Sequence, residues 1–267
     1  MKTNKLLVCA LPVIEALLGA GSGLMAADSS ACKGLPSHAD LQKALKSARG
    51  QANGGFNLDM WGTIVNRDGV VCAVAFTGNS RGDQWPGSRV ISAQKANTAN
   101  AFSLPGLALS TANLYSAVQP GGTLFGLQHS NPVDPAVAYA GNPSLYGQPN
   151  DPMVGAHPGG VNVFGGGLAL YGPGGTLLGA LGVSGDSSCA DHNIAWRTRN
   201  GLNLDFVPKP ADDPHAISGD HLRPDNIVYD ITPQSGQMPG VSAKGWGHPE
   251  CSAAATAIAK TLPIVQP

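Results

Sequence analysis

The sequence predicts an α+β fold in which a small antiparallel sheet built from hairpins packs against helices. Two hairpin patterns are separated by stretches of helical periodicity, an order typical of α+β domains rather than doubly wound ones. Hydrophobic residues make up 42% of the 267 residues, enough for the core of one large domain. The 36 glycines and 21 prolines indicate many turns, yet they stay below the fraction typical of disordered chains.

Charge excludes two classes of function. The formal net charge is −1 and only 12% of the residues are charged, so nothing favours a nucleic-acid partner. No basic run indicates a membrane surface, and beyond the N-terminus no stretch approaches the ~20 apolar residues of a membrane span.

The N-terminus has the pattern of a secretory signal peptide, which we place at residues 1–27. Lys2 and Lys5 precede the apolar run Leu6–Leu18, and small residues then lead to Ala27. A proline and a glutamate interrupt the run, so a buried N-terminal helix is the alternative. Cleavage would leave a secreted or periplasmic protein of residues 28–267, which we expect to be a single domain.

The cysteine count agrees with export. If Cys9 leaves with the signal, Cys32, Cys72, Cys189 and Cys251 remain, an even number suited to two disulfides in an oxidising compartment. Three pairings are possible and the sequence does not choose among them. The spacings include no C-x-x-C, which disfavours zinc and redox dithiols.

The first elements are a helix and a hairpin. Ser37 and Asp40 form a capping box, Leu41 and Leu45 recur at helical spacing, and Gly50 ends the segment. Residues 60–65 and 70–76 read as strands on either side of an Asn-Arg-Asp-Gly turn, a strong hairpin signal.

A second helix is predicted from near Ser88 to Phe102. Ile91, Thr98 and Phe102 share one face, and the alanines beside that face would let another segment pack closely. Residues 103–160 are rich in Pro, Gly and Asn, and we expect long loops with one short helix at most. Such a stretch inside a compact domain is usually functional.

The remaining chain contains a second hairpin and two helices. Strands are predicted at 161–171 and 176–184, and glycines inside them mark close approach of another backbone or of a ligand. Asp186, Ser187 or Ser188 would cap a helix that ends near Gly201. Residues 203–250 read as a polar extension, and a last helix is predicted at 251–262 with Ala254, Ile258 and Leu262 in line.

Four motifs in order resemble the GlcG/HbpS-like family of haem-binding proteins. They are Arg67-Asp68-Gly69, Lys95-Ala-Asn-Thr-Ala99, the Gly165–Leu168 run and the segment Gly179–Gly185, followed by Asp191 as the helix-opening acid. The resemblance covers about residues 36–203. The loop insertion 103–160 and the C-terminal extension 204–267 depart from the family pattern.

This resemblance implies a small antiparallel sheet flanked by helices, assembly into a homo-oligomer, and binding of haem or a related tetrapyrrole such as a corrinoid. Relatives are linked to haem storage, sensing or degradation, so an enzymatic role stays open. The family's iron ligand has no fixed motif position, and none is carried over.

The iron ligand is therefore sought by chemistry. Haem iron takes an axial His, Cys, Met or Tyr, and disulfides would remove the cysteines. His192 is the first candidate because Asp191 could orient its ring, although it could also be a solvated residue at a helix start. Lys95 could pair with a propionate or lie on a solvated face.

Other histidines complete the candidates. His38, His129 and His157 are expected to be surface residues that could also ligate iron. Glycines in the hairpin could admit a flat ligand. The predicted cofactor-binding set is His192, Asp191, Lys95, Gly166, Gly182 and His157.

Two alternatives to haem binding remain. Gly185-Asp186-Ser187 together with the later Asp-Asp-Pro-His215 resembles the blocks of SGNH-type serine hydrolases, which would make Ser187 the nucleophile and His215 its base. The other alternative is a divalent-metal-binding protein whose ligands would be His215, Asp220, His221 and Asp225.

Overall fold

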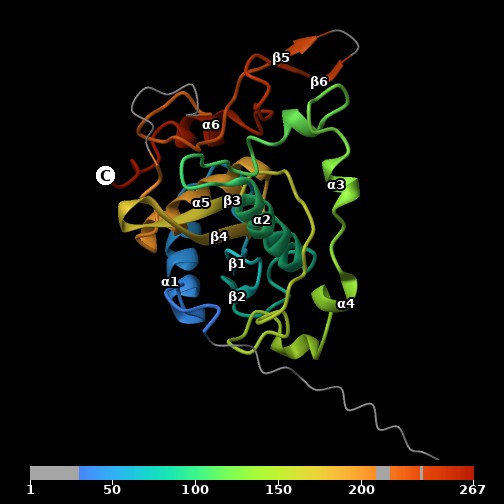
Figure 1. The fold of residues 1–267 in the computed structure, drawn as a ribbon, viewed down its shortest axis with the longest axis vertical. Helices are drawn as coiled ribbons and strands as arrows, with labels where there is room; N and C mark the ends of the chain where they lie inside the picture. The colour runs from blue at the N-terminus through green and yellow to red at the C-terminus, as the bar shows by residue number, and fades with distance from the viewer. Residues whose placement is uncertain (1–29, 209–216, 235–236) are drawn as a thin grey trace, which may run out of the picture.

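A four-stranded antiparallel sheet forms the centre of the protein (Figure 1). In this computed structural model the described residues are 30–208, 217–234 and 237–267; the predicted signal peptide and His215 lie outside them. The strand order is β2-β1-β4-β3, and the strands are β1 (Trp61–Asn66), β2 (Val71–Phe76), β3 (Gly167–Gly172) and β4 (Thr176–Ser184). The predicted α+β class and both hairpins are confirmed.

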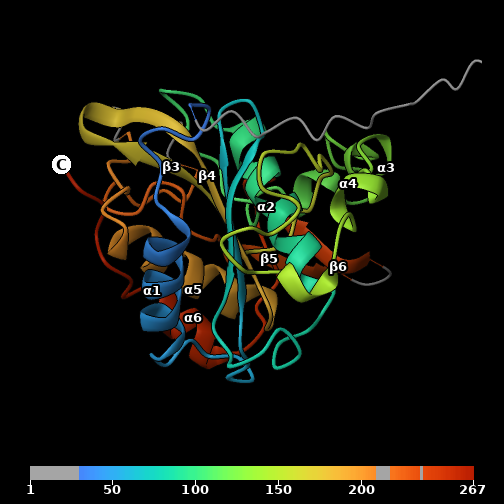
Figure 2. The same cartoon turned by 90° about the horizontal axis from the view of Figure 1, so that it is seen from below.

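Helices cover both faces of this sheet (Figure 2). The helix α2 (Ser88–Phe102) crosses one face, chiefly over β4 and β1. On the other face α1 (His38–Arg49) packs against β2 and against α5 (Ser188–Gly201), which also contacts β4. The short helix α6 (Ala253–Ala259) lies on α5.

The helix α1 begins where the sequence predicts. The Ser37 hydroxyl accepts a hydrogen bond from the Asp40 backbone N–H, and the Asp40 carboxylate accepts from the Ser37 N–H, which completes the capping box. Leu41 and Leu45 are buried against the sheet. Local signals and tertiary burial therefore agree in this element.

The buried face of α2 differs from the prediction. Ala93, Ala96 and Ala99 are fully buried, whereas Ile91 is only half-buried. The cause lies in the sheet, because a Cβ atom added to Gly182 would clash with the Ser92 carbonyl and lie 2.5 Å from the Ala96 nitrogen. Small residues on both sides let the helix backbone rest directly on β4, so a helix rather than a flat ligand fills this space.

The strand β3 starts at Gly167, six residues later than predicted. The preceding segment pairs elsewhere: the Val161 N–H donates to the Asn131 carbonyl, and the Asn162 N–H donates to the Thr98 hydroxyl. Gly166 has φ 115°, a left-handed value that favours glycine, and this bend separates the two stretches.

The insertion 103–160 is more ordered than predicted. A buried salt bridge pins it to α2, since the Arg89 Nε lies 2.8 Å from the Asp151 carboxylate, which also accepts from the Gly147 N–H at 2.6 Å. The expectation of one short helix at most is wrong. The segment contains η1 (Ser116–Val118), α3 (Leu127–Ser130), α4 (Pro135–Ala138) and η2 (Pro143–Leu145).

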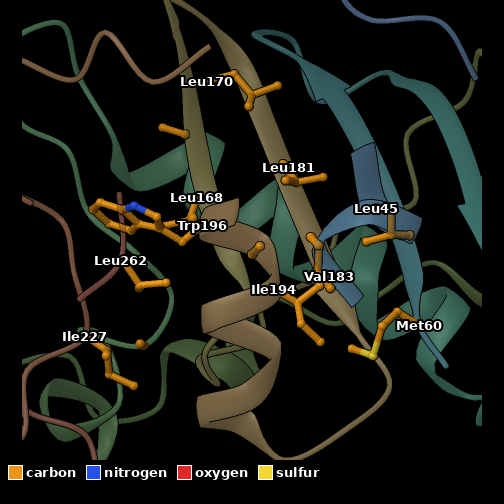
Figure 3. Packing of buried hydrophobic residues seen from close by; sticks show 14 of the residues in the cluster. Leu45, Met60, Leu168, Leu170, Leu181, Val183, Ile194, Trp196, Ile227 and Leu262 are labelled. Carbon is orange, nitrogen blue, oxygen red and sulfur yellow. The ribbon is translucent and has the colours of Figure 1, made fainter. Parts of the chain in front are cut away.

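The C-terminal extension wraps around α5. It holds a hairpin that the sequence did not predict, β5 (Ile231–Gln234) with β6 (Gln237–Ser242), and α6 is shorter than expected. Ala255, Thr256 and Ala259 are the buried positions of α6 rather than Ala254, which is exposed. Figure 3 shows Leu262 and Ile227 beside Trp196, on the side of α5 away from Leu45 and Met60.

Two disulfides are present, as predicted. Cys32 bonds to Cys72 and ties the chain before α1 to β2, while Cys189 bonds to Cys251 and ties the start of α5 to the C-terminal extension. Among the described residues, no helix has the length and apolar character needed to cross a membrane.

Candidate functional site

Lys95 and Asp191 form a buried ion pair between α2 and α5. The Lys95 ammonium lies 2.7 Å from the Asp191 carboxylate and donates to the Val183 carbonyl at 3.1 Å. The second Asp191 oxygen accepts from the Asp186 N–H at 2.8 Å. Lys95 is 1% exposed, so its placement on a solvated face is wrong. The pair joins the Lys-Ala helix, the end of the Gly-rich hairpin and the acid of α5.

Burial and the neighbouring ammonium act in opposite directions on the pKa of the Asp191 carboxyl. Burial raises the pKa of Asp191 to about 6, and the neighbouring Lys95 ammonium offsets part of that rise. Every polar atom of the pair that the protein buries has a partner, which is the condition under which a buried ion pair is tolerated. Neither charged group is presented to a ligand here.

His192 is a core residue with no exposed surface. Its Nε2 lies 3.1 Å from the Asn226 side-chain oxygen and 3.2 Å from the Ile227 nitrogen. The Ile227 N–H donates to Nε2, and the Asn226 amide is itself fixed by donating to the Ala259 carbonyl. The buried Nδ1 has no hydrogen-bond partner. Burial lowers the pKa of His192 to about 4, and Asp191 is engaged with Lys95 rather than with this ring.

The surroundings of His192 do not fit a macrocycle. The Trp196 ring centroid lies 6.0 Å from that of His192, and a Cβ atom on Gly165 would lie 3.0 Å from the His192 Cβ. A Cβ atom on the following residue, Gly166, would clash with the Val183 carbonyl. Protein atoms therefore fill the space that the predicted Gly166 and Gly182 were expected to leave for a flat ligand.

His157 is the candidate histidine with an accessible ring. It is exposed, and its Nδ1 lies 3.1 Å from the Asp68 carbonyl in the β1–β2 turn. A carbonyl only accepts, so Nδ1–H donates and the lone pair is on Nε2. Among the described residues Nε2 has no hydrogen-bond partner. This is the state in which a histidine binds a metal.

The two other candidate histidines differ from His157. His38 is half-buried at the start of α1 and donates from Nε2 to the Gly147 carbonyl at 2.8 Å. His129 is exposed on α3. The structure therefore brings Lys95, Asp191 and Gly166 together, whereas His157 lies at the β1–β2 turn.

The sequence did not predict a hydrogen-bonded pair formed by Ser188 and His248. The Ser188 hydroxyl lies 2.7 Å from the His248 Nε2, and His248 Nδ1–H donates to the Pro249 carbonyl at 2.7 Å. The Gly165 N–H donates to the Ser188 oxygen. Burial lowers the pKa of His248 to about 4. No local signal marks His248, which stands alone between a glycine and a proline, and only the fold brings it to Ser188.

The two alternatives to haem binding receive no support from the described residues. The Ser187 hydroxyl is buried without a hydrogen-bond partner, and the base proposed for it, His215, lies outside the described residues. Asp225 lies 2.6 Å from Arg199, and Asp220 lies 3.0 Å from Arg223. These ion pairs use the carboxylates that the predicted divalent-metal site required.

Cavities of about 730, 570 and 270 Å³ occur among the described residues. The cavity of about 730 Å³ lies between residues 116–123 and the segment 240–246. None of these three is lined by a His, Cys, Met or Tyr side chain, so none offers haem iron one of its usual ligands.

Comparison with solved structures gives distant matches. A PduOC–haem complex is 24% identical with a TM-score of 0.44, covering 63% of this chain and 94% of that chain. The Klebsiella pneumoniae protein ORFY is 21% identical with a TM-score of 0.42, covering 62% and 90%. HbpS is 13% identical with a TM-score of 0.37, covering 61% and 84%.

Comparison with protein families is more specific. No curated protein matches the chain. The family described as "Haem degrading protein HbpS-like" matches residues 37–199, which include the sheet, α1, α2 and almost all of α5. Because this match spans more than half of the chain, the protein belongs to the HbpS-like family.

Proposed function

We propose that this protein binds haem, as an exported member of its family. The observation that carries the proposal is the family match over residues 37–199, which contains the whole central sheet. The two disulfides and the predicted signal peptide support a place in an oxidising compartment. Storage, sensing and turnover of haem all begin with this binding step.

We place the iron ligand at His157. Ligation needs a ring nitrogen with a free lone pair, and a hydrogen bond from the other nitrogen to a carbonyl fixes that tautomer. His157 meets both conditions, since Nδ1–H donates to Asp68 and the side chain belongs to an exposed residue. Asp68 belongs to the Asp-Gly turn, one of the motifs that carry the family resemblance.

His192 is the second candidate for the iron ligand. Its Nδ1 has no hydrogen-bond partner, but the ring is enclosed by Trp196 and by the Asn226–Ile227 segment. The rest of the predicted set, Lys95 with Asp191 and the glycines, supports the fold around α2 rather than a ligand.

A site at His157 is incomplete in one chain. A bound ligand usually buries most of its surface, and no cavity among those described lies at this residue. A second protomer would have to cover the outer face of the macrocycle, in agreement with the homo-oligomer that the resemblance implies.

Titration with hemin, followed by absorption and by size-exclusion chromatography, tests this function. We expect a saturable Soret shift, together with an oligomer that haem stabilises. A corrinoid titrated in the same way separates the two tetrapyrrole classes, and tight corrinoid binding without a hemin response would replace haem as the ligand. Absence of any response to either compound would overturn the proposal.

A further inference from the structure

Cys189, His248 and Cys251 form a cluster outside the haem proposal. Their Sγ and ring nitrogen atoms all lie within 4.8 Å of one another. Among the described residues this is the one group of His, Cys, Asp or Glu that could hold a metal ion. Cys189 comes from the first turn of α5, and the other two residues come from the C-terminal extension, beside the cap of α6.

The His248 ring is held with one edge toward the sulfur atoms. Nδ1 lies 4.0 Å from the Cys189 Sγ, whereas Nε2 lies 2.7 Å from the Ser188 hydroxyl on the opposite side of the ring. The Gly165 N–H, 2.7 Å away, fixes that hydroxyl in turn. Metal-binding histidines are commonly oriented in this way, by a hydrogen bond to the nitrogen that does not ligate.

We propose that reduction of the Cys189–Cys251 disulfide creates a binding site for Zn²⁺ or another thiophilic divalent cation. The ligands are the two thiolates and the His248 Nδ1, and a water molecule takes the fourth position of a tetrahedral site. Two thiolates balance the charge of the cation.

The chemistry needs a reductant and releases protons. A dithiol gives two electrons and two protons to the disulfide and becomes a disulfide itself, leaving two cysteine thiols. The cation then displaces both thiol protons into solution. The His248 proton leaves Nδ1, where it is donated to the Pro249 carbonyl, and moves to Nε2, where it is donated to the Ser188 oxygen.

Access and geometry allow this exchange. Cys251 is exposed and Cys189 is buried, so a reductant can attack one sulfur while α5 holds the other in place. Zinc–sulfur bonds of about 2.3 Å put two sulfur ligands about 3.8 Å apart, a separation that a small shift of Cys251 provides.

The site would keep the C-terminal extension attached to α5 in both redox states. The disulfide joins these two parts when oxidised, and the metal joins them when reduced. Sequence spacing could not find the cluster, because Cys189 is separated by about 60 residues from its two partners.

Cobalt binding to the reduced protein tests the proposal. Co²⁺ added after treatment with a phosphine reductant should give thiolate-to-cobalt charge-transfer bands at one ion per chain, and the oxidised protein should give none. His248→Ala should weaken binding at least tenfold, and Ser188→Ala should weaken it to a smaller degree. The Cys32→Ser/Cys72→Ser variant is the matched control, which loses the other disulfide and should bind cobalt normally.

Two results would overturn the proposal. One is a reduced protein without the charge-transfer bands, whether or not its circular dichroism shows it folded. The other is cobalt binding by His248→Ala with the same affinity as wild type, which would mean that the thiols bind the metal without the His248 ring. A zinc-dependent rise in the melting temperature of reduced wild type, absent in His248→Ala, is the supporting measurement.

Discussion

Lys95 and Asp191, which the sequence predicted to bind a cofactor, instead form a buried ion pair that stabilises the fold. The two residues are 1% and 2% exposed, and each depends on the other for charge balance. A lysine followed by small residues is the same in sequence whether it faces solvent or a buried acid. The pattern therefore located the motif correctly, but it could not give the direction of the ammonium group.

Lys95→Met should lower the free energy of unfolding by about 3–5 kcal/mol at pH 8, because it leaves the Asp191 carboxylate buried and unpaired. The loss should be smaller at pH 5, since the pKa of Asp191 rises further without Lys95 and the acid is then protonated. Urea denaturation at both pH values measures this. The exposed Lys43→Met is the control, and an equally small loss in both variants would contradict the buried pair.

The buried histidines give stability a defined dependence on pH. Burial lowers the pKa of His192 and of His248 to about 4, from about 6.5 in the unfolded chain. Below pH 6.5 the unfolded state binds more protons, so stability falls as pH falls toward 4, by about 2 kcal/mol per histidine at pH 5. Asp191 opposes this, since its raised pKa adds stability as pH falls from about 6 toward 3.8.

Urea denaturation of the oxidised protein at pH 7.5 and pH 5 tests this balance. Wild type should lose stability between the two values, because two histidines outweigh one acid. His192→Gln should lose less over the same interval, while the exposed His129→Gln should behave as wild type. An equal pH dependence in all three proteins would mean that the His192 ring is not buried in the neutral form.

Among the helices and strands, prediction succeeded where local chemistry decides the structure. The capping box of α1 and the Asp-Gly turn between β1 and β2 act within a few residues. The predicted side-chain cap of α5 is wrong, because the Ser187 hydroxyl caps no backbone N–H. Prediction also failed where a distant partner decides. The buried face of α2 follows the glycines of β4, and the order of the 103–160 insertion depends on the Arg89–Asp151 salt bridge.

Gly182→Ala should destabilise the protein by about 1–3 kcal/mol, because the added methyl group overpacks the contact between β4 and α2. The control is Gly106→Ala, where a Cβ atom meets nothing within 4 Å. Thermal unfolding of both variants measures the difference. If Gly182→Ala had the same melting temperature as Gly106→Ala, α2 would not rest on β4.

In the molecule as a whole, the C-terminal extension covers one face of α5. The family match ends at residue 199, before this extension begins. Asp225 neutralises Arg199, Asn226 binds His192, and the Pro263 carbonyl accepts from Trp196. The sequence showed that the extension departs from the family pattern. It could not show that the extension seals His192, since the contacts join residues far apart in the chain.

Removing the Cys189–Cys251 disulfide should loosen this cover. We expect Cys189→Ser/Cys251→Ser to lose about 2–4 kcal/mol of stability. Limited proteolysis should then cut within residues 217–267 before it cuts the sheet. The matched variant Cys32→Ser/Cys72→Ser should lose a similar amount of stability without that early cleavage. Early cleavage in both variants, or in neither, would contradict the anchoring role.

The central claim is that this HbpS-like chain binds haem through His157, and a comparison of three proteins in one hemin titration tests it most directly. Wild type and His129→Ala should show the same saturable Soret shift. His157→Ala should show a displaced Soret band and at least tenfold weaker binding, because its iron loses the nitrogen ligand. Identical spectra and affinities in wild type and His157→Ala would contradict the account.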